Sequence, residues 1–309
     1  KAVSVAVAAV VFGLVSGVGF STYAFVRERQ AFRALLESER RAAVERARFA
    51  VVSGDMPRVE EALREAAAKG VAEADRRLLR GQFLVASGLY QEAVDELRPL
   101  LDADPNRVAV LGLFAAAYAK VNWSEYELLL PRLRAARPVS ADDHLFLGQA
   151  LAVMAYTEPQ LGLELIEKAV SMQDSPMARV ILADARINHA AQSARVEIME
   201  AALREVAAAE AWSPNSLPVL VSSCRAHTLA ARLFERIGQA ERAAAERQMA
   251  DARGRRLEAF YPSTHALSTR LYQLEDTGAG EEARRKAREW ATDLPKLRSL
   301  CVWMEWEAG

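Results

Sequence analysis

Cysteine is scarce in this chain, which has only Cys224 and Cys301 among its 309 residues. The two lie far apart and neither belongs to a CxxC pair, so we expect neither a disulfide framework nor a zinc site. Both are expected to be small buried hydrophobic residues. The four histidines show no metal-ligand spacing and no HExxH motif. We therefore expect no metal and no cofactor.

Signatures of catalysis and of nucleic-acid binding are also missing. The sequence has no glycine-rich phosphate loop after a strand, no GxSxG motif and no Cys–His signature, so no catalytic residue is predicted. The net charge of −1 argues against a nucleic-acid partner, which would select a basic face. An all-helical enzyme remains an alternative that perturbed carboxylates in a deep pocket would support.

The composition is that of an all-α protein. Hydrophobic residues make up 51% of the chain and charged residues 26%, and alanine, leucine, arginine and glutamate dominate. These residues favour helices. No run of alternating β-branched residues bounded by turns is present, so we expect no sheet.

One stretch of 34 residues, Ala74 to Arg107, predicts two short helices joined by a tight turn. A glycine ends the first helix because glycine readily adopts positive φ, and a proline closes the unit because it cannot continue a helix. The order is small residue, turn glycine, tyrosine, crossing alanine, large apolar residue and proline, at Gly81, Gly88, Tyr90, Ala93, Leu97 and Pro105. We expect Ala93 to be buried where the two helices cross.

The same pattern returns in phase along the chain. Gly54 and Gly88 are 34 residues apart, and turn glycines recur at Gly238 and Gly278. This recurrence argues against the alternative of a lone helical hairpin. We predict two arrays of repeats, residues 40–223 and 224–309, the second with a final capping helix. Within the first array, 177–223 is either a further repeat or a linker, and the internal prolines Pro99 and Pro131 are expected to kink or break second helices.

This pattern resembles the tetratricopeptide repeat (TPR), whose period is 34 residues. The resemblance implies an antiparallel helix-pair α-solenoid. A solenoid of this kind presents a concave groove lined by the first helices of successive repeats.

The N-terminal region predicts one transmembrane helix. Residues 2–26 carry no charge, and at about 1.5 Å per residue they exceed a hydrocarbon core of about 30 Å. Tyr23 and Phe25 followed by Arg27 are typical of a membrane boundary. We therefore predict a single-pass membrane protein in contact with the bilayer through residues 2–26, with a transmembrane helix over 1–26. A buried core helix is the alternative.

Two features next to this segment bear on its partners. Gly13 and Gly17 form a GxxxG motif that can seat a helix dimer, although such motifs also arise by chance. Residues 27–39 predict a basic helical stalk, continuous with the membrane helix through Val52 and attractive to anionic lipid. The arginines after Val26 would place the repeats in the cytoplasm. The resemblance described next implies the opposite side, so the side of the membrane on which the repeats lie stays open.

A charge-free span, a basic stalk and helical repeats, in that order, resemble the C-terminal part of bacterial membrane-anchored serine/threonine protein kinases. The resemblance implies that the repeats lie outside the cell and that a kinase domain precedes Lys1, which is not an initiator methionine. None of the kinase motifs is present in this chain, so catalysis would belong to the preceding part.

The sequence therefore predicts a membrane-tethered TPR-like interaction or sensor module, the non-catalytic part of a larger kinase. The alternative is a stand-alone membrane-anchored scaffold or assembly protein. On the repeat register, the polar residues expected to line a peptide-binding groove are Arg48, Gln82, Lys120, Gln149, Asn188 and Arg232. Such a row suits a protein or peptide ligand with acidic groups, although each residue alone is equally consistent with an ordinary exposed side chain.

Overall fold

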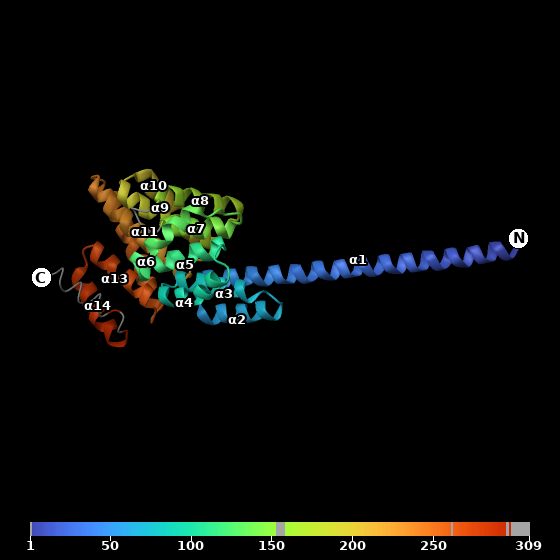
Figure 1. The fold of residues 1–309 in the computed structure, drawn as a ribbon. Coiled ribbons are helices and arrows are strands. Elements are labelled where there is room, and N and C mark those ends of the chain that lie inside the picture. The colour runs from blue at the N-terminus through green and yellow to red at the C-terminus, as the bar shows by residue number, and fades with distance from the viewer. Residues whose placement is uncertain (1, 153–157, 261, 295–296, 298–309) are drawn as a thin grey trace.

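The computed structural model shows helices throughout the part of the chain that it describes (Figure 1). It describes residues 2–152, 158–260, 262–294 and 297, with side chains described from residue 25 onward except at residue 192. Fourteen α-helices, one short 3-10 helix and no strand lie in this part, which confirms the all-α prediction. In chain order they are α1 (Ala2–Ser53), α2 (Met56–Ala68), α3 (Glu73–Ala86), α4 (Tyr90–Ala103), α5 (Val108–Val121), α6 (Trp123–Ala135), α7 (Ala141–Ala152), α8 (Pro159–Met172), α9 (Pro176–Ser193), α10 (Val196–Trp212), α11 (Leu217–Arg236), α12 (Ala240–Leu257), η1 (Glu258–Phe260), α13 (Thr264–Asp276) and α14 (Gly280–Asp293).

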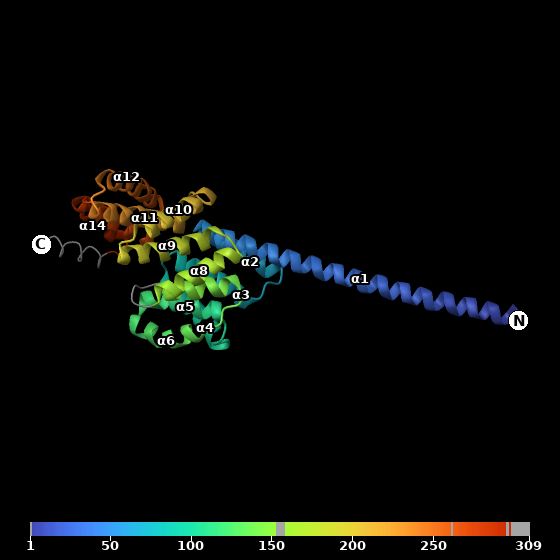
Figure 2. The same cartoon turned by 90° about the horizontal axis from the view of Figure 1, so that it is seen from above.

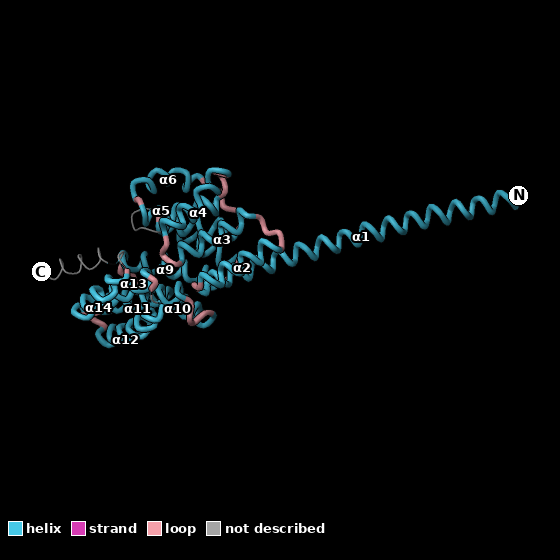
Figure 3. Tube along the Cα trace, turned by 90° about the horizontal axis from the view of Figure 1, so that it is seen from below, coloured by secondary structure: helices cyan, strands magenta, loops and turns pink. Residues whose placement is uncertain are grey.

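Consecutive helices form seven pairs joined by short loops, from α1–α2 to α13–α14 (Figure 3). Four of the turns within pairs are made by Gly54, Gly88, Gly238 and Gly278, whose φ angles lie between 72° and 86°. A residue with a Cβ is strained in this conformation, which explains why glycine recurs at the turns. The result is a TPR-like α-solenoid.

The α3–α4 pair has the packing that the sequence predicts. Ala93 is fully buried, and a Cβ added to Gly81 would lie 2.6 Å from a methyl carbon of Leu97. The two helices therefore cross at small residues that leave no room for a larger side chain.

The internal prolines do not interrupt their helices, and this corrects the sequence-based expectation. Pro99 lies inside α4 and Pro131 inside α6, and both helices continue to the ends given above. Both prolines are exposed, as are Asp95 and Glu127 four residues earlier. The carbonyl that loses its helical hydrogen bond thus faces water, which lowers the cost of the proline.

The end of the first predicted array holds a further helix pair. Helices α9 and α10 pack against each other, and only residues 213–216 separate α10 from α11. The Ser216 hydroxyl caps α11 by accepting a hydrogen bond from the Val219 amide at 3.5 Å. Residues 177–223 therefore lie in α9, α10 and the start of α11, which begins seven residues before Cys224.

Helix α1 runs without a break for 52 residues, or about 78 Å. This confirms the predicted continuity of the helix through Val52. The outer part of α1 projects far from the helical body (Figures 1 and 2). The projecting part of α1 exposes the apolar side chains of Phe25, Phe32 and Leu35.

None of the helices is long and apolar enough to cross a membrane over the residues whose side chains are described. Side chains are not described before residue 25, so most of the predicted span, with the GxxxG motif at Gly13 and Gly17, lies outside the residues to which this finding applies. The predicted capping helix after Pro295 also lies outside the described residues.

The first two repeats touch the last ones, so the solenoid closes on itself. The Ser216 hydroxyl donates a hydrogen bond to the main-chain carbonyl of Val52 at the inner end of α1. A Cβ added to Gly54 would lie 2.9 Å from the Cβ of Leu217. His265 on α13 covers the α3–α4 turn, 6.5 Å from Tyr90 between ring centroids in an edge-on contact.

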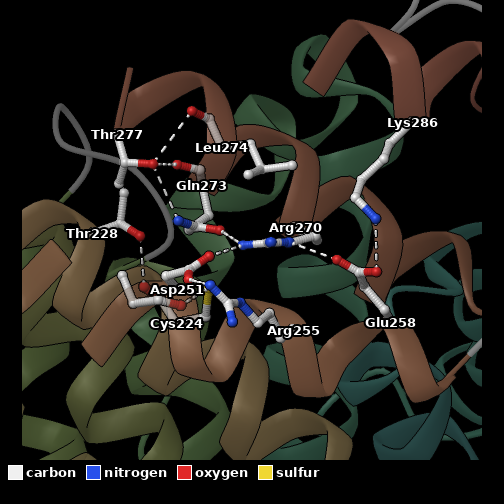
Figure 4. Close-up of polar contacts among 11 residues, drawn as sticks. Cys224, Thr228, Asp251, Arg255, Glu258, Arg270, Gln273, Leu274, Thr277 and Lys286 are labelled. Carbon is white, nitrogen blue, oxygen red and sulfur yellow. Dashed lines mark hydrogen bonds and ion pairs between the residues drawn. The ribbon is translucent and has the colours of Figure 1, made fainter. Parts of the chain in front are cut away.

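A buried arginine fixes the last helix pair to the one before it (Figure 4). Only 3% of the Arg270 side chain is exposed. Its guanidinium donates to Asp251 of α12 at 2.8 Å and to Glu258 of η1 at 2.9 Å. Glu258 also accepts a hydrogen bond from Lys286 of α14 at 2.8 Å. One ionic cluster thus joins α12, η1, α13 and α14.

Of the two cysteines, Cys224 is buried in α11, as the sequence predicts. Burial raises the pKa of its thiol to about 12, so the thiol stays protonated. Cys301 lies outside the described residues.

We expect Gly112→Ala to destabilise the fold by about 1–3 kcal/mol, measured by urea unfolding of the full chain. The new Cβ would meet the main chain of Phe146 and Leu147 at 2.5 Å, so α5 and α7 would have to separate. Gly280→Ala is the control, because its Cβ would meet only the flexible ends of Glu275 and Arg284, at 3.2 Å or more. Equal stability of Gly112→Ala and the wild type would show that the two helices are not in backbone contact.

Replacing the buried arginine, as Arg270→Met, should cost about 3 kcal/mol at pH 7, because it leaves two partly buried carboxylates without their shared partner. The control is Arg255→Met, which removes an exposed ion pair to the same Asp251 and should cost less than about 1 kcal/mol.

The effect of Arg270→Met should also depend on pH. Burial raises the pKa of Asp251, but hydrogen bonding and charge from Arg270 outweigh it, so the net pKa is lowered. The pKa of Glu258 is lowered in the same way by Lys286 and Arg270. Stability from carboxylates with lowered pKa is present above their unfolded pKa, about 4, and is lost as pH falls through the folded pKa. The unfolding curves of the wild type and Arg270→Met should differ at pH 7 and converge at pH 3. An unchanged difference between the two proteins at pH 3 would contradict the ionic role.

Candidate ligand-binding cavity

Inner helices of the solenoid line a cavity of about 370 Å³ that is partly open to solvent. This volume lies at the lower end of the range for small-ligand cavities, about 300–1,000 Å³. Six first helices contribute to its wall, namely α3, α5, α7, α9, α11 and α13. These helices thus converge on one partly open site.

Four of the six predicted groove residues line this cavity. They are Gln82, Lys120, Gln149 and Asn188, which come from four successive first helices. A role for them in binding stays a prediction, and the structure shows that they are close enough to act on one ligand.

The predicted groove residue Arg48 lies outside the cavity, in a neighbouring recess of about 240 Å³ that Gln82 also lines. Its guanidinium donates to Asp142 of α7 at 2.5 Å and to Gln173 after α8 at 3.1 Å. Burial raises the pKa of Asp142, although the Arg48 charge acts in the opposite direction. Arg48 therefore bridges the solenoid from α1 to α7 and α8.

Arg232 also lies away from the cavity, where it pairs with Asp276 at 3.1 Å. The charged residue of α11 that faces the cavity is Arg225, two helical turns earlier on the same face. The sequence-based register misses it because α11 begins at Leu217 and not at Cys224. A helical face recurs after seven residues, so the register placed an arginine of the correct type two turns too far along the helix.

Arg225 is held by partners from α9. Its guanidinium donates to Asp184 at 3.0 Å and to Asn188 at 3.3 Å. Asp184 accepts a second hydrogen bond from the Ser222 hydroxyl, also at 3.0 Å. This network ties α9 to α11 and offsets the charge of Arg225 within the wall.

Lys120, on the last turn of α5, differs from Arg225. Its side chain remains open to solvent and makes no hydrogen bond or ion pair with any described residue. Burial lowers the pKa of Lys120, and Arg225 lowers it further while Asp184 opposes both. When Lys120 is protonated, the cavity lining carries two positive charges, on Lys120 and Arg225, and one negative charge, on Asp184. The lining therefore has one excess positive charge.

Two further polar groups face the cavity without a partner among the described residues. The Tyr90 hydroxyl and the His265 ring take part in no hydrogen bond there. Burial raises the pKa of Tyr90. Burial, then Arg225 and Lys120, lower the pKa of His265 to about 4, so its imidazole is neutral at pH 7. Tyr90 is the tyrosine of the repeat pattern, but no sequence signal places it or His265 at the cavity, because the two meet there only through closure of the solenoid.

No protein-family model matches the chain, and no curated protein matches its sequence. Three solved structures are similar in helical arrangement. A TPR protein from Parabacteroides merdae is 15% identical, with 87% of this chain and 99% of that one covered and a TM-score of 0.42. A thermophilic TPR protein from Thermus thermophilus is 16% identical, with 75% and 98% covered and a TM-score of 0.39. MamA is 16% identical, with 58% and 97% covered and a TM-score of 0.36. The chain resembles these proteins in fold alone.

The neutral His265 gives a pH-dependent stability. Its folded pKa of about 4 lies below the unfolded value of about 6.5, so the unfolded chain takes up the proton first. The contribution of His265 to the free energy of unfolding is complete above pH 6.5 and should fall by about 2 kcal/mol as the pH drops toward 4.

Urea unfolding at pH 7 and pH 4.5 should show a smaller loss of stability on acidification for His265→Asn than for the wild type. His144→Asn, on the surface of α7, serves as control. The same loss for all three proteins would contradict a buried neutral imidazole at position 265.

Proposed function

We propose that this chain is a TPR-like interaction module that binds a short segment of a protein partner in its central cavity. One observation carries the proposal. Polar side chains from successive first helices, several of them without a partner in the described part, meet around a single cavity on the concave face. Helical-repeat solenoids use this face to bind peptides, and convergent polar groups in an apolar cavity are typical of a binding site.

The size of the cavity limits the ligand. A volume of about 370 Å³ accommodates a few side chains and no long extended segment. The partner would therefore insert one short element, with the rest of the partner outside the solenoid. The polar wall residues would set its orientation by hydrogen bonds.

The proposal includes a membrane tether through residues 2–26. Its support is the charge-free sequence, the unbroken helix α1 and the exposed apolar side chains at Phe25 and Phe32. A single-pass location, with a helix dimer through Gly13 and Gly17, is part of this proposal. The test is flotation of the full chain with liposomes, compared with a Val11→Arg/Leu14→Arg variant. Arginine costs about 2.5–3.5 kcal/mol at the centre of a membrane helix, so the variant should stay at the bottom of the gradient. Flotation of both proteins would reject a spanning helix.

Attachment to a serine/threonine kinase is a finer proposal, supported by the order of charge-free segment, basic stalk and repeats. The alternative is a scaffold with no kinase attached. The sequence encoded before Lys1 decides between them, since a kinase domain there would carry a glycine-rich loop and the HRD and DFG motifs.

The binding proposal is tested with the full chain in detergent. The chain is immobilised and used to select binders from a displayed library of random linear octapeptides. Affinities of the enriched peptides are then compared with those for a Gln82→Ala/Gln149→Ala variant. Two lost hydrogen bonds, at about 0.5–1.5 kcal/mol each, should weaken binding about tenfold.

Arg232→Ala is the matched control for this experiment, because Arg232 is a polar residue of a first helix that lies outside the cavity. Its affinity should equal that of the wild type. Failure to enrich any peptide, or equal affinities for the wild type and the double variant, would reject the cavity as the binding site.

A further inference from the structure

We propose that the cavity selects peptides with an acidic side chain beside an apolar one, and that Lys120 is the residue that reads the acidic group. This inference rests on the proposed peptide binding and specifies its ligand. It follows from the different surroundings of the two cations in the wall, Lys120 and Arg225.

Arg225 is already engaged with groups of the protein. Two of its nitrogens already donate to Asp184 and Asn188. A second carboxylate brought to this guanidinium would lie beside Asp184, and two like charges at close range oppose each other. Arg225 therefore serves to position the α9–α11 wall.

Lys120 is the cation whose N–H donors have no partner among the described residues. An ammonium has three donors and no acceptor, and this one has no hydrogen-bond or ion-pair partner among the described residues. Its side chain reaches solvent, so an incoming group can approach it without breaking an existing contact. The nearby Arg225 raises the local positive potential, which a ligand carboxylate would relieve.

The charge balance favours a monoanion. With Arg225 offset by Asp184, one positive charge remains to be matched. A carboxylate matches it, whereas a phosphorylated side chain carries about −1.5 to −2 charges at pH 7 and would leave an unmatched charge in a partly buried site. A glutamate or aspartate side chain is therefore the ligand group that we assign to Lys120.

The remaining wall is largely apolar and favours a ligand with an apolar side chain next to the acidic one. It is formed by the buried side chains Leu113, Ile166, Val180, Ile181 and Val221. A leucine-sized side chain buried against such a wall adds further affinity, because its apolar surface leaves water. The acidic group at Lys120 then fixes its position, as a polar group does in most apolar sites.

The experiment repeats the octapeptide selection with four proteins, all as full chains in detergent: wild type, Lys120→Met, Lys120→Arg and Arg232→Met. The library is displayed in two formats, one with a free peptide carboxyl terminus and one with the terminus capped by a fusion partner. Enriched sequences are compared with the input library for the frequency of acidic residues next to apolar ones.

The wild type, Lys120→Arg and Arg232→Met should enrich acidic–apolar pairs at least about tenfold in both formats, the ratio expected for one charge-assisted hydrogen bond. Lys120→Met should still enrich peptides with apolar residues but lose the acidic preference. An acidic preference that survives in Lys120→Met, or that is absent from the wild type, overturns the assignment. Enrichment only in the free-terminus format would overturn it in favour of a terminal carboxylate. No enrichment with any protein would mean that the proposed peptide binding itself fails.

Discussion

The inner end of α1 forms the contact on which the rest of this structure depends. The Val52 carbonyl accepts a hydrogen bond from Ser216, and the turn at Gly54 packs directly on Leu217. This contact joins residues that are 164 positions apart in the sequence. A solenoid of helix pairs touches only its neighbours unless a contact of this kind closes it. Here closure brings α13 over the α3–α4 turn and adds His265 to the wall of the cavity.

The local parts of the fold are readable from the sequence because they depend on single residues. Gly54 and Gly88 mark turns since only glycine tolerates their φ angles, and Ala93 marks a helix crossing since nothing larger fits. The same reasoning overstated Pro99 and Pro131. A proline breaks a helix when the carbonyl it releases is buried, and the local sequence does not reveal which way that carbonyl faces.

The site is only partly readable, for a different physical reason. Gln82, Lys120, Gln149 and Asn188 follow from repeat register, because each lies on the inner face of a first helix. Which inner residues remain free for a ligand depends on the superhelical winding. That winding brings Asp142 to Arg48 and uses its donors inside the chain, and it brings His265 to Tyr90 from repeats far apart in the sequence. A short error in the start of α11 was enough to exchange Arg225 for Arg232.

The unbroken length of α1 has a mechanical consequence. Its inner end forms part of the wall of the recess beside the cavity, through Arg48 and Val52, while residues 2–40 extend outward for roughly 58 Å. A stiff rod pivoting at its base magnifies small movements. A tilt of about 5° at the inner end displaces the outer end by about 5 Å, close to the rise of one helical turn. A rearrangement of the bridge from Arg48 to Asp142 that tilted α1 by this amount would therefore reach the N-terminal end of the helix as a displacement of several ångströms.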